Sequence, residues 1–315
     1  MNTMLARINS FLEKAMPLLA FLGVILGVLF YPFFLQIRPF IPWLFALITL
    51  SGSLTLRVRD LGKSVSSPLP FVLFFIVSHV IMPLFVFLIA SAIFENNPDT
   101  LSGYILLYAM PTAVTSFIWV SIFRGDLSLA LAFILLDSLL APVLVPLKMR
   151  LFLGANIELN MTGLVIALIF MVVIPTVMGV SLNESSRGKI PLFISPWLNP
   201  ASKICFFVVI SGNSAAVATQ IHPANPLLWI VFVVCLGFAV MAFVLGKLTG
   251  LLGKINRQKQ IAIFFASGLR NMSSALVLAV EFLPPAAALP AVLGILVQQA
   301  SAAVMGRLFL GNSDR

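Results

Sequence analysis

Apolar residues occur in long runs along this chain, and short polar segments separate the runs. Most runs contain about 20 residues, the length that an α-helix needs to cross the hydrocarbon core of a bilayer. The pattern predicts ten membrane-spanning helices, at about residues 15–35, 39–56, 69–94, 101–123, 125–148, 160–182, 196–220, 226–250, 258–281 and 284–311. The predicted fold class is therefore an all-α membrane protein.

The composition points to the same class. Of the 315 residues, 61% are hydrophobic and 9% are charged, whereas about 25% of the residues of a soluble domain are charged. The net charge of +9 does not indicate a nucleic-acid partner, because the basic residues lie in short segments between the runs rather than in one patch. The partner that the composition predicts is the lipid bilayer.

Few residues have the spacing that catalysis or metal binding requires. The two cysteines, Cys205 and Cys235, both fall inside apolar runs. The chain has no nucleophile–base arrangement, glycine-rich phosphate loop or metal-ligand cluster in its sequence. We therefore expect no metal, no cofactor and no enzymatic activity.

The basic residues are distributed unevenly between the two ends of the predicted spans. Three lie at one end, namely Arg38, Lys148 and Arg150. Fifteen lie at the other end: Arg7, Lys14, Arg57, Arg59, Lys63, Arg124, Arg187, Lys189, Lys203, Lys247, Lys254, Arg257, Lys259, Arg307 and Arg315. Because cytoplasmic loops carry an excess of Lys and Arg, we expect a multi-pass protein of the bacterial inner or plasma membrane with both termini in the cytoplasm.

Ten spans divide into two halves of five. An odd number of spans per half gives the second half the opposite orientation, which is the inverted repeat of many secondary transporters. Polar and helix-breaking residues interrupt the fourth span of each half: Pro111, Thr112, Thr115 and Ser116 in "AMPTAVTSF", and Ser267, Gly268, Arg270, Asn271, Ser273 and Ser274 in "SGLRNMSS". These matching interruptions predict a binding site at the membrane midplane. The alternative is that Ser and Thr only tighten helix packing.

Several segments resemble the bile acid:sodium symporter family, and the resemblance covers about residues 15–310. They are "LTLRVRDL" after the second predicted span, "SHVIMP" in the third, "PTAVTSFIWVSIFRGD" in the fourth, and "SGLRNMSSALVL" followed by "ALPAVL". The resemblance implies a panel domain at about 15–56 and 160–220, a core domain at about 69–148 and 226–311, and two interrupted helices that cross in the core. It also implies transport of an organic anion with sodium, by alternating access between the two domains.

The chain departs from the family at the positions that the resemblance assigns to sodium. Those side-chain ligands fall, in chain order, on Ser78, Phe117, Ala130, Ile134, Ala266 and Arg270. Sodium is a hard cation that needs several oxygen ligands, whereas most of these side chains carry no oxygen and one carries a fixed positive charge. We expect sodium binding at these sites to be lost and coupling to be sodium-independent, either proton-coupled or facilitative.

Arg270 lies deep in the ninth predicted span, where an unpaired charge costs between about 3 and 15 kcal/mol. Asp137, in "FILLDSLLAPV", lies at a comparable depth, and a bidentate Asp137–Arg270 ion pair is predicted. His79, in "IVSHVIMPL", is the third ionisable residue expected there. Three roles are open: the pair replaces the sodium charge and locks the crossing; Asp137 or His79 exchanges a proton while Arg270 tunes it; or Arg270 binds the anionic substrate.

The sequence thus predicts a secondary transporter of a small organic anion, with protons as a candidate coupling ion. Its candidate site residues are the three ionisable residues, five polar residues of the interruptions, and one residue on the panel side in "VISGNSAAV": His79, Asp137, Arg270, Thr112, Thr115, Ser116, Ser267, Asn271 and Asn213. The alternative is a non-transporting sensor or channel-like relative whose core the Asp137–Arg270 pair locks. The sequence leaves the substrate and the oligomeric state open.

Overall fold

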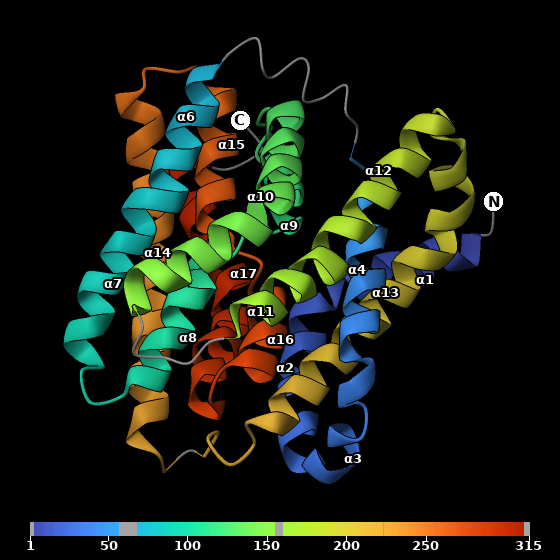
Figure 1. Ribbon diagram of the computed structural model, residues 1–315. Coiled ribbons are helices and arrows are strands. Elements are labelled where there is room, and N and C mark those ends of the chain that lie inside the picture. The colour runs from blue at the N-terminus through green and yellow to red at the C-terminus, as the bar shows by residue number, and fades with distance from the viewer. Residues whose placement is uncertain (1–2, 57–67, 155–159, 223, 312–315) are drawn as a thin grey trace.

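The computed structural model of the protein describes residues 3–56, 68–154, 160–222 and 224–311 (Figure 1). Every regular element within these residues is a helix, which confirms the all-α class. Six of the described helices are long and apolar enough to cross a membrane, and a pair bent by 70°, Arg7–Glu13 with Leu18–Leu29, would be a seventh. The ten spans and the inverted repeat stay predictions.

The helices form two groups that lie side by side (Figure 1). The first group comprises α1 (Thr3–Lys14), α2 (Met16–Leu29), α3 (Tyr31–Leu35), the 3-10 helix η1 (Arg38–Phe40), α4 (Ile41–Ser53), α11 (Met161–Leu168), the π-helix η3 (Ile169–Val173), α12 (Ile174–Ser185) and α13 (Lys189–Ala216). In this group α13 packs against α2 and α4, and α12 also packs against α4.

The second group holds both interrupted helices. It comprises α6 (Pro68–Ile76), the π-helix η2 (Val77–Ile81), α7 (Met82–Ile93), α8 (Pro98–Ala109), α9 (Thr115–Ile122), α10 (Leu127–Leu153), α14 (Pro226–Leu252), α15 (Arg257–Gly268), α16 (Met272–Phe282), the 3-10 helix η4 (Pro285–Ala288) and α17 (Leu289–Leu310). The helix α14 packs against α15 and α17. The predicted panel and core domains are not tested by these contacts and stay a prediction.

Both interruptions occur where the sequence predicts them. Helix α8 ends at Ala109 because Pro111 has no backbone N–H and disfavours the helical conformation of Met110, which is extended. Helix α15 ends at Gly268, and the chain becomes helical again only after Asn271. The side chain of Asn271 accepts a hydrogen bond from the backbone of α16 and is its N-cap.

The two non-helical segments cross each other as one antiparallel bridge between Thr112 and Arg270. The N–H of Ala113 donates to the carbonyl oxygen of Leu269 (2.9 Å), and the N–H of Asn271 donates to the carbonyl oxygen of Pro111 (2.9 Å). Each segment therefore satisfies part of the backbone of the other, which is a requirement for non-helical chain inside a membrane.

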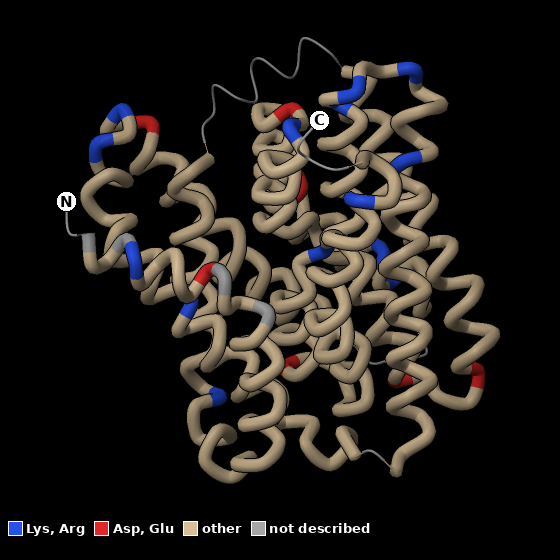
Figure 2. Tube along the Cα trace, turned by 180° about the vertical axis from the view of Figure 1, so that it is seen from behind, with Lys and Arg blue, Asp and Glu red and all other residues tan. Residues whose placement is uncertain are grey.

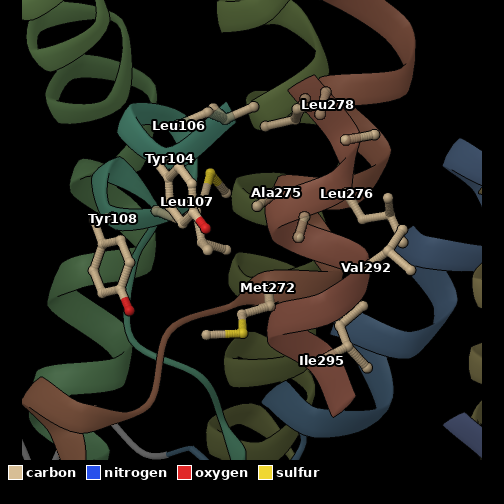
Figure 3. Packing of buried hydrophobic residues seen from close by; sticks show 14 of the residues in the cluster. Tyr104, Leu106, Leu107, Tyr108, Met272, Ala275, Leu276, Leu278, Val292 and Ile295 are labelled. Atoms are coloured by element: carbon tan, nitrogen blue, oxygen red, sulfur yellow. The ribbon is translucent and has the colours of Figure 1, made fainter. Parts of the chain in front are cut away.

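Apolar packing fixes the half-helices on either side of the crossing. Leu107 of α8, Met272 of α16 and Val292 of α17 belong to one buried cluster (Figure 3). Helix α8 also lies so close to η4 that a Cβ atom at Gly103 would clash with the carbonyl oxygen of Ala287. A displaced half-helix would open a cavity in this cluster, so the crossing is held in one place.

Large apolar side chains cover much of the outer surface, as expected for a protein in lipid. Leu151, Leu192 and Phe193 are between 71% and 79% exposed. Lys and Arg residues gather toward one end of the molecule (Figure 2). Four basic residues used to predict the orientation lie outside the described residues: Arg57, Arg59, Lys63 and Arg315. The cytoplasmic location of the termini stays a prediction.

Candidate functional site

Arg270 is completely buried at the crossing, and its partners are mainly backbone carbonyls. Its Nη2 atom donates to the carbonyl oxygen of Ser78 (3.0 Å) and its Nη1 atom donates to that of Met110 (3.4 Å). Its backbone N–H donates to the side-chain oxygen of Gln298 on α17 (2.9 Å). The guanidinium thus joins η2 to the end of α8, and the backbone N–H of Arg270 adds a contact with α17.

These carbonyls are available because two helices are irregular. In the π-helix η2 the N–H of Met82 donates to the carbonyl oxygen of Val77. With the same spacing of five residues, the carbonyl oxygen of Ser78 would accept from the backbone N–H of residue 83, but Pro83 has no N–H. Met110 follows the last residue of α8, where carbonyls have no partner within the helix. A donor from elsewhere must satisfy both groups, and Arg270 does so.

Asp137 lies mid-way along α10 and is also completely buried. Its Oδ2 atom accepts the backbone N–H of Thr112 (2.8 Å). Its Oδ1 atom lies 3.1 Å from Nε2 of His79, at a poor angle for a hydrogen bond. Arg270 Nη1 lies 4.0 Å from Oδ2. The predicted Asp137–Arg270 ion pair is therefore present as one long contact, and the bidentate form predicted for it is wrong.

His79 lies between Asp137 and Lys148 of α10. Its ring stacks on Phe75, with centroids 4.9 Å apart and an interplanar angle of 27°. This packing directs Nε2 toward Asp137 and Nδ1 toward Lys148, whose Nζ atom lies 2.9 Å away. The structure therefore brings together His79, Asp137 and Arg270, and adds a fourth ionisable residue.

Lys148 is the functional candidate that the sequence interpretation missed. Its expected location at the outer end of a span is wrong, because α10 continues to Leu153 and the lysine side chain is only 5% exposed. Nζ also donates to the carbonyl oxygen of Ala109 at the end of α8 (2.7 Å). The available signal was the spacing: Lys148 follows Asp137 by eleven residues, about three helical turns, so both lie on one face of α10.

Three predicted residues of the crossing have structural partners. The hydroxyl of Thr112 donates to the carbonyl oxygens of Ala266 (2.8 Å) and Leu269 (3.1 Å), which α15 leaves free at its end. Ser267 accepts a hydrogen bond from the hydroxyl of Ser78 (3.4 Å). Asn271 caps α16, as described above. These residues hold the crossing together, and the backbone N–H of Thr112 also contacts the Asp137 carboxylate of the cluster.

Three others lie outside the cluster. Thr115 is half-buried and accepts a hydrogen bond from the side chain of Gln299 (3.4 Å). The hydroxyl of Ser116, at the start of α9, is buried without a hydrogen-bond partner in the described residues. Asn213 belongs to α13 in the first group, and its buried Nδ2 atom likewise has no partner in the part of the chain that is described.

The cluster of His79, Asp137, Lys148 and Arg270 has more positive than negative groups. One carboxylate faces one ammonium and one guanidinium, and the imidazole adds charge only when protonated. Within the described residues no group of three or more His, Cys, Asp or Glu side chains has the arrangement of a metal site. The chemistry that the cluster can perform is anion attraction and proton exchange.

Ionisable groups buried where two broken helices cross, inside an apolar helical protein, define a multi-pass membrane transporter. The comparison with known families agrees: residues 41–220 match the sodium bile acid symporter family. The chain belongs to this family, which is a family of transporters.

The most informative relatives differ in what their names state. The uncharacterized protein YbaS of Bacillus subtilis (strain 168) is 37% identical over 296 residues, 92% of this chain and 95% of that protein. The uncharacterized sodium-dependent transporter YocS of the same organism is 24% identical, over 90% of this chain and 87% of its own length. The probable sodium/metabolite cotransporter BASS3, chloroplastic, of Arabidopsis thaliana is 24% identical, over 85% of this chain and 62% of its own length.

Proposed function

We propose that this protein is a secondary transporter that carries a small organic anion without binding sodium. The observation that carries the proposal is the use of the free carbonyls at the crossing. Lys148 donates to Ala109, and Arg270 donates to Ser78 and Met110. Carbonyl oxygens at the end of a broken helix attract cations, and here tethered cations already occupy them.

The side chains around the crossing support the same conclusion. Ala130, Ile134 and Ala266, which stand where the resemblance places sodium ligands, are all completely buried and carry no oxygen in their side chains. A sodium ion at these positions would lack side-chain oxygen ligands and would lie near the positive charges of the cluster. The names of YocS and BASS3 attribute sodium dependence to those proteins, and our proposal for this chain differs because of these residues.

An anionic substrate fits the N-terminal ends of the half-helices that begin at the crossing. The N-termini of α9 and α16 lie at the crossing, and helix N-termini favour negative charge. Beside them lie the hydroxyls of Ser116 and Ser274, which are buried without hydrogen-bond partners in the described residues. Thr115 and Asn271 are half-buried, so this side of the crossing is accessible. The net positive charge of the cluster adds to the attraction.

The architecture in our proposal has ten spans in two inverted halves. Alternating access would arise from movement of the panel helices, about 15–56 and 160–220, against the core helices that contain the crossing. The gathering of Lys and Arg at one end supports cytoplasmic termini and a location in the bacterial inner or plasma membrane. Asn213, on a panel helix, is the proposed contact to the substrate from that side.

Thermal unfolding of the purified protein in NaCl and in choline chloride tests sodium independence. A ligand at 100 times its dissociation constant stabilises the folded state by about 2.7 kcal/mol, so a bound sodium ion would be evident. We expect equal unfolding temperatures in the two salts at equal ionic strength. A rise that is specific to sodium would overturn the proposal.

Trp119 provides a reporter for the anion. Its indole N–H donates to Gln299 (2.9 Å), and Gln299 in turn contacts Thr115 at the crossing. In a variant in which Phe replaces the other tryptophans, Trp43, Trp197 and Trp229, the tryptophan fluorescence comes from Trp119 alone and reports on its surroundings. We expect a saturable change with one of a panel of small carboxylates and none with matched cations. Quenching by cations instead would contradict an anion site.

A locked, non-transporting relative is the second candidate, because hydrogen bonds join both broken helices to each other and to α10. Proteoliposomes that are loaded with the carboxylate identified by the fluorescence screen distinguish the two candidates. A transporter exchanges internal for external radiolabelled carboxylate, whereas a locked relative binds it without exchange.

A further inference from the structure

We propose that Lys148 and His79 together form a proton-binding site, in which one proton is shared between the lysine amine and the imidazole. This inference rests on the proposed sodium-independent transport and names the ion that replaces sodium in the coupling. The sequence interpretation had assigned proton exchange to Asp137 or His79, and it did not include Lys148.

The distance between the two nitrogens requires a single proton in the contact. Lys148 Nζ and His79 Nδ1 lie 2.9 Å apart, so one must donate and the other must offer a lone pair. In one state the ammonium donates to a bare Nδ1 atom. In the other, the Nζ–H bond has broken, an Nδ1–H bond has formed, and the positive charge has moved to the imidazole ring with the proton.

The surroundings give both states a partner. Nε2 of His79 lies 3.1 Å from the Asp137 carboxylate, so an imidazolium has a counterion. Nζ of Lys148 also contacts the carbonyl oxygen of Ala109 (2.7 Å), so an ammonium has a second acceptor. No carboxylate of the described residues lies within ion-pair distance of Lys148. The charge is therefore free to move between the two nitrogens without breaking an ion pair.

Asp137 is a poorer candidate for the exchanged proton. Its Oδ2 atom accepts the backbone N–H of Thr112 (2.8 Å) and lies 4.0 Å from Arg270, and both neighbours favour the ionised carboxylate. Its side chain is 1% exposed and that of Arg270 is 0% exposed, whereas the side chain of His79 is 7% exposed. Of these groups, the imidazole is the one that a proton can reach.

Ionisable groups on the neighbouring helices do not take part in the contact. Helices α6 and α7 contain no ionisable side chain. The thiol of Cys235 on α14 faces the carbonyl of Pro290 and the hydroxyl of Tyr104. On α15, Arg257 and Lys259 belong to the first turn, at the far end from the crossing. Tyr108 of α8 lies near Arg270 rather than near the pair. Asp137 and Arg270 are thus the charges that face the site.

A second proton would separate the pair. If His79 and Lys148 both carried a positive charge, neither nitrogen would offer a lone pair and the contact would break. Repulsion between the two positive charges would then move the ammonium away from the ring and change its contact with the carbonyl of Ala109, the last residue of α8. Proton binding would in this way change the end of a half-helix at the crossing, which is the kind of link that coupled transport requires.

Nitrogen NMR of histidine-labelled protein tests the proposal. The chain has two histidines, and His222 is exposed on a loop, so a His222→Gln background leaves His79 as the single labelled ring. Spectra are recorded over a pH series for this protein and for its Lys148→Arg, Lys148→Met and Lys247→Met variants. The last is the control, because it removes a lysine of α14 that is not a partner of His79 in the structure.

Transfer of the shared proton does not change the number of protons on the pair, so over the pH range in which the pair holds one proton we expect a constant His79 Nδ1 signal between those of a bare and of a protonated nitrogen. In Lys148→Arg the guanidinium still donates but does not give up its proton, so the signal should be that of a bare, hydrogen-bonded nitrogen over the same range. In Lys148→Met the hydrogen-bonded signal itself should be lost. The Lys247→Met protein should match the parent.

The proposal is overturned if the Nδ1 signal is the same in the parent and in Lys148→Arg, or if Lys148→Met leaves it unchanged. All spectra are recorded in choline chloride and repeated in NaCl. A change of the His79 signals that only sodium produces would overturn the proposed function. A sodium-independent signal that the Lys148 variants do not alter would overturn only the shared proton.

Discussion

Replacement of Asp137 by Asn tests the electrostatic account of the cluster. Asn keeps the shape of the side chain and an acceptor for the N–H of Thr112, but it removes the single carboxylate of the cluster. Asp137 Oδ2 lies 4.0 Å from Arg270 Nη1. Two unit charges at this distance attract each other by about 4 kcal/mol at an effective dielectric constant of 20. Removal of one partner of a buried ion pair costs a similar amount, about 3–5 kcal/mol.

We therefore expect Asp137→Asn to lower the free energy of unfolding by about 4 kcal/mol. Unfolding is followed by tryptophan fluorescence in mixed micelles of dodecyl maltoside and SDS. The double variant Asp137→Asn/Arg270→Met has the same net charge as the natural cluster but removes the donor of the Ser78 and Met110 carbonyls. Its loss should therefore be smaller than the sum of the losses of the two single variants. A coupling between the two sites below about 1 kcal/mol would refute the reasoning.

Two further substitutions have matched controls in the same chain. Thr112→Val removes the hydroxyl that donates to the carbonyl oxygens of Ala266 and Leu269 at the end of α15, and should lower the free energy of unfolding by about 1–3 kcal/mol. Thr115→Val, with one contact of 3.4 Å, should cost less than about 1 kcal/mol in the same micelle assay. Gly103→Ala places a Cβ atom against the backbone of η4 and should reduce the yield of monodisperse protein in size-exclusion chromatography, whereas Gly237→Ala, with open space around it, should not.

The interruptions of the two helices could be predicted because their causes are local. Pro111 prevents helix at the residue before it, and Gly268 and Asn271 are typical of helix ends and starts. The apolar runs likewise predict where the helices lie, since the length and hydrophobicity of a run are properties of the sequence itself. The approach of His79, Asp137 and Arg270 was predicted from their depth in the runs together with the resemblance to a known family.

The partners of the charged residues could not be predicted in the same way. The acceptors of Arg270 are carbonyls, which every residue has, and only the irregular hydrogen bonding of η2 and the end of α8 make these particular ones free. Lys148 was placed outside the membrane because a charge near the end of an apolar run usually marks a boundary. Its side chain is instead buried, with Nζ against His79 and the carbonyl of Ala109.

Pro83 offers a test of how the carbonyl of Ser78 comes to accept Arg270. In η2 the N–H of Met82 donates to Val77, so the residue at position 83 would be the backbone partner of Ser78. Pro83→Ala supplies the missing N–H, which then competes with the Arg270 guanidinium for the same oxygen. A buried charged donor that loses its acceptor costs about 1–3 kcal/mol or more, so Pro83→Ala should lower the free energy of unfolding by this amount.

Pro175→Ala is the matched control for this substitution. Pro175 follows the π-helix η3 in the same register, because the N–H of Ile174 donates to Ile169 as that of Met82 donates to Val77. Neither Arg270 nor Lys148 donates to a carbonyl of η3. The two substitutions have the same effect on the unfolded chain, so the difference between them in the micelle assay isolates the arginine contact. Equal losses of stability would mean that Arg270 does not depend on the carbonyl that Pro83 leaves free.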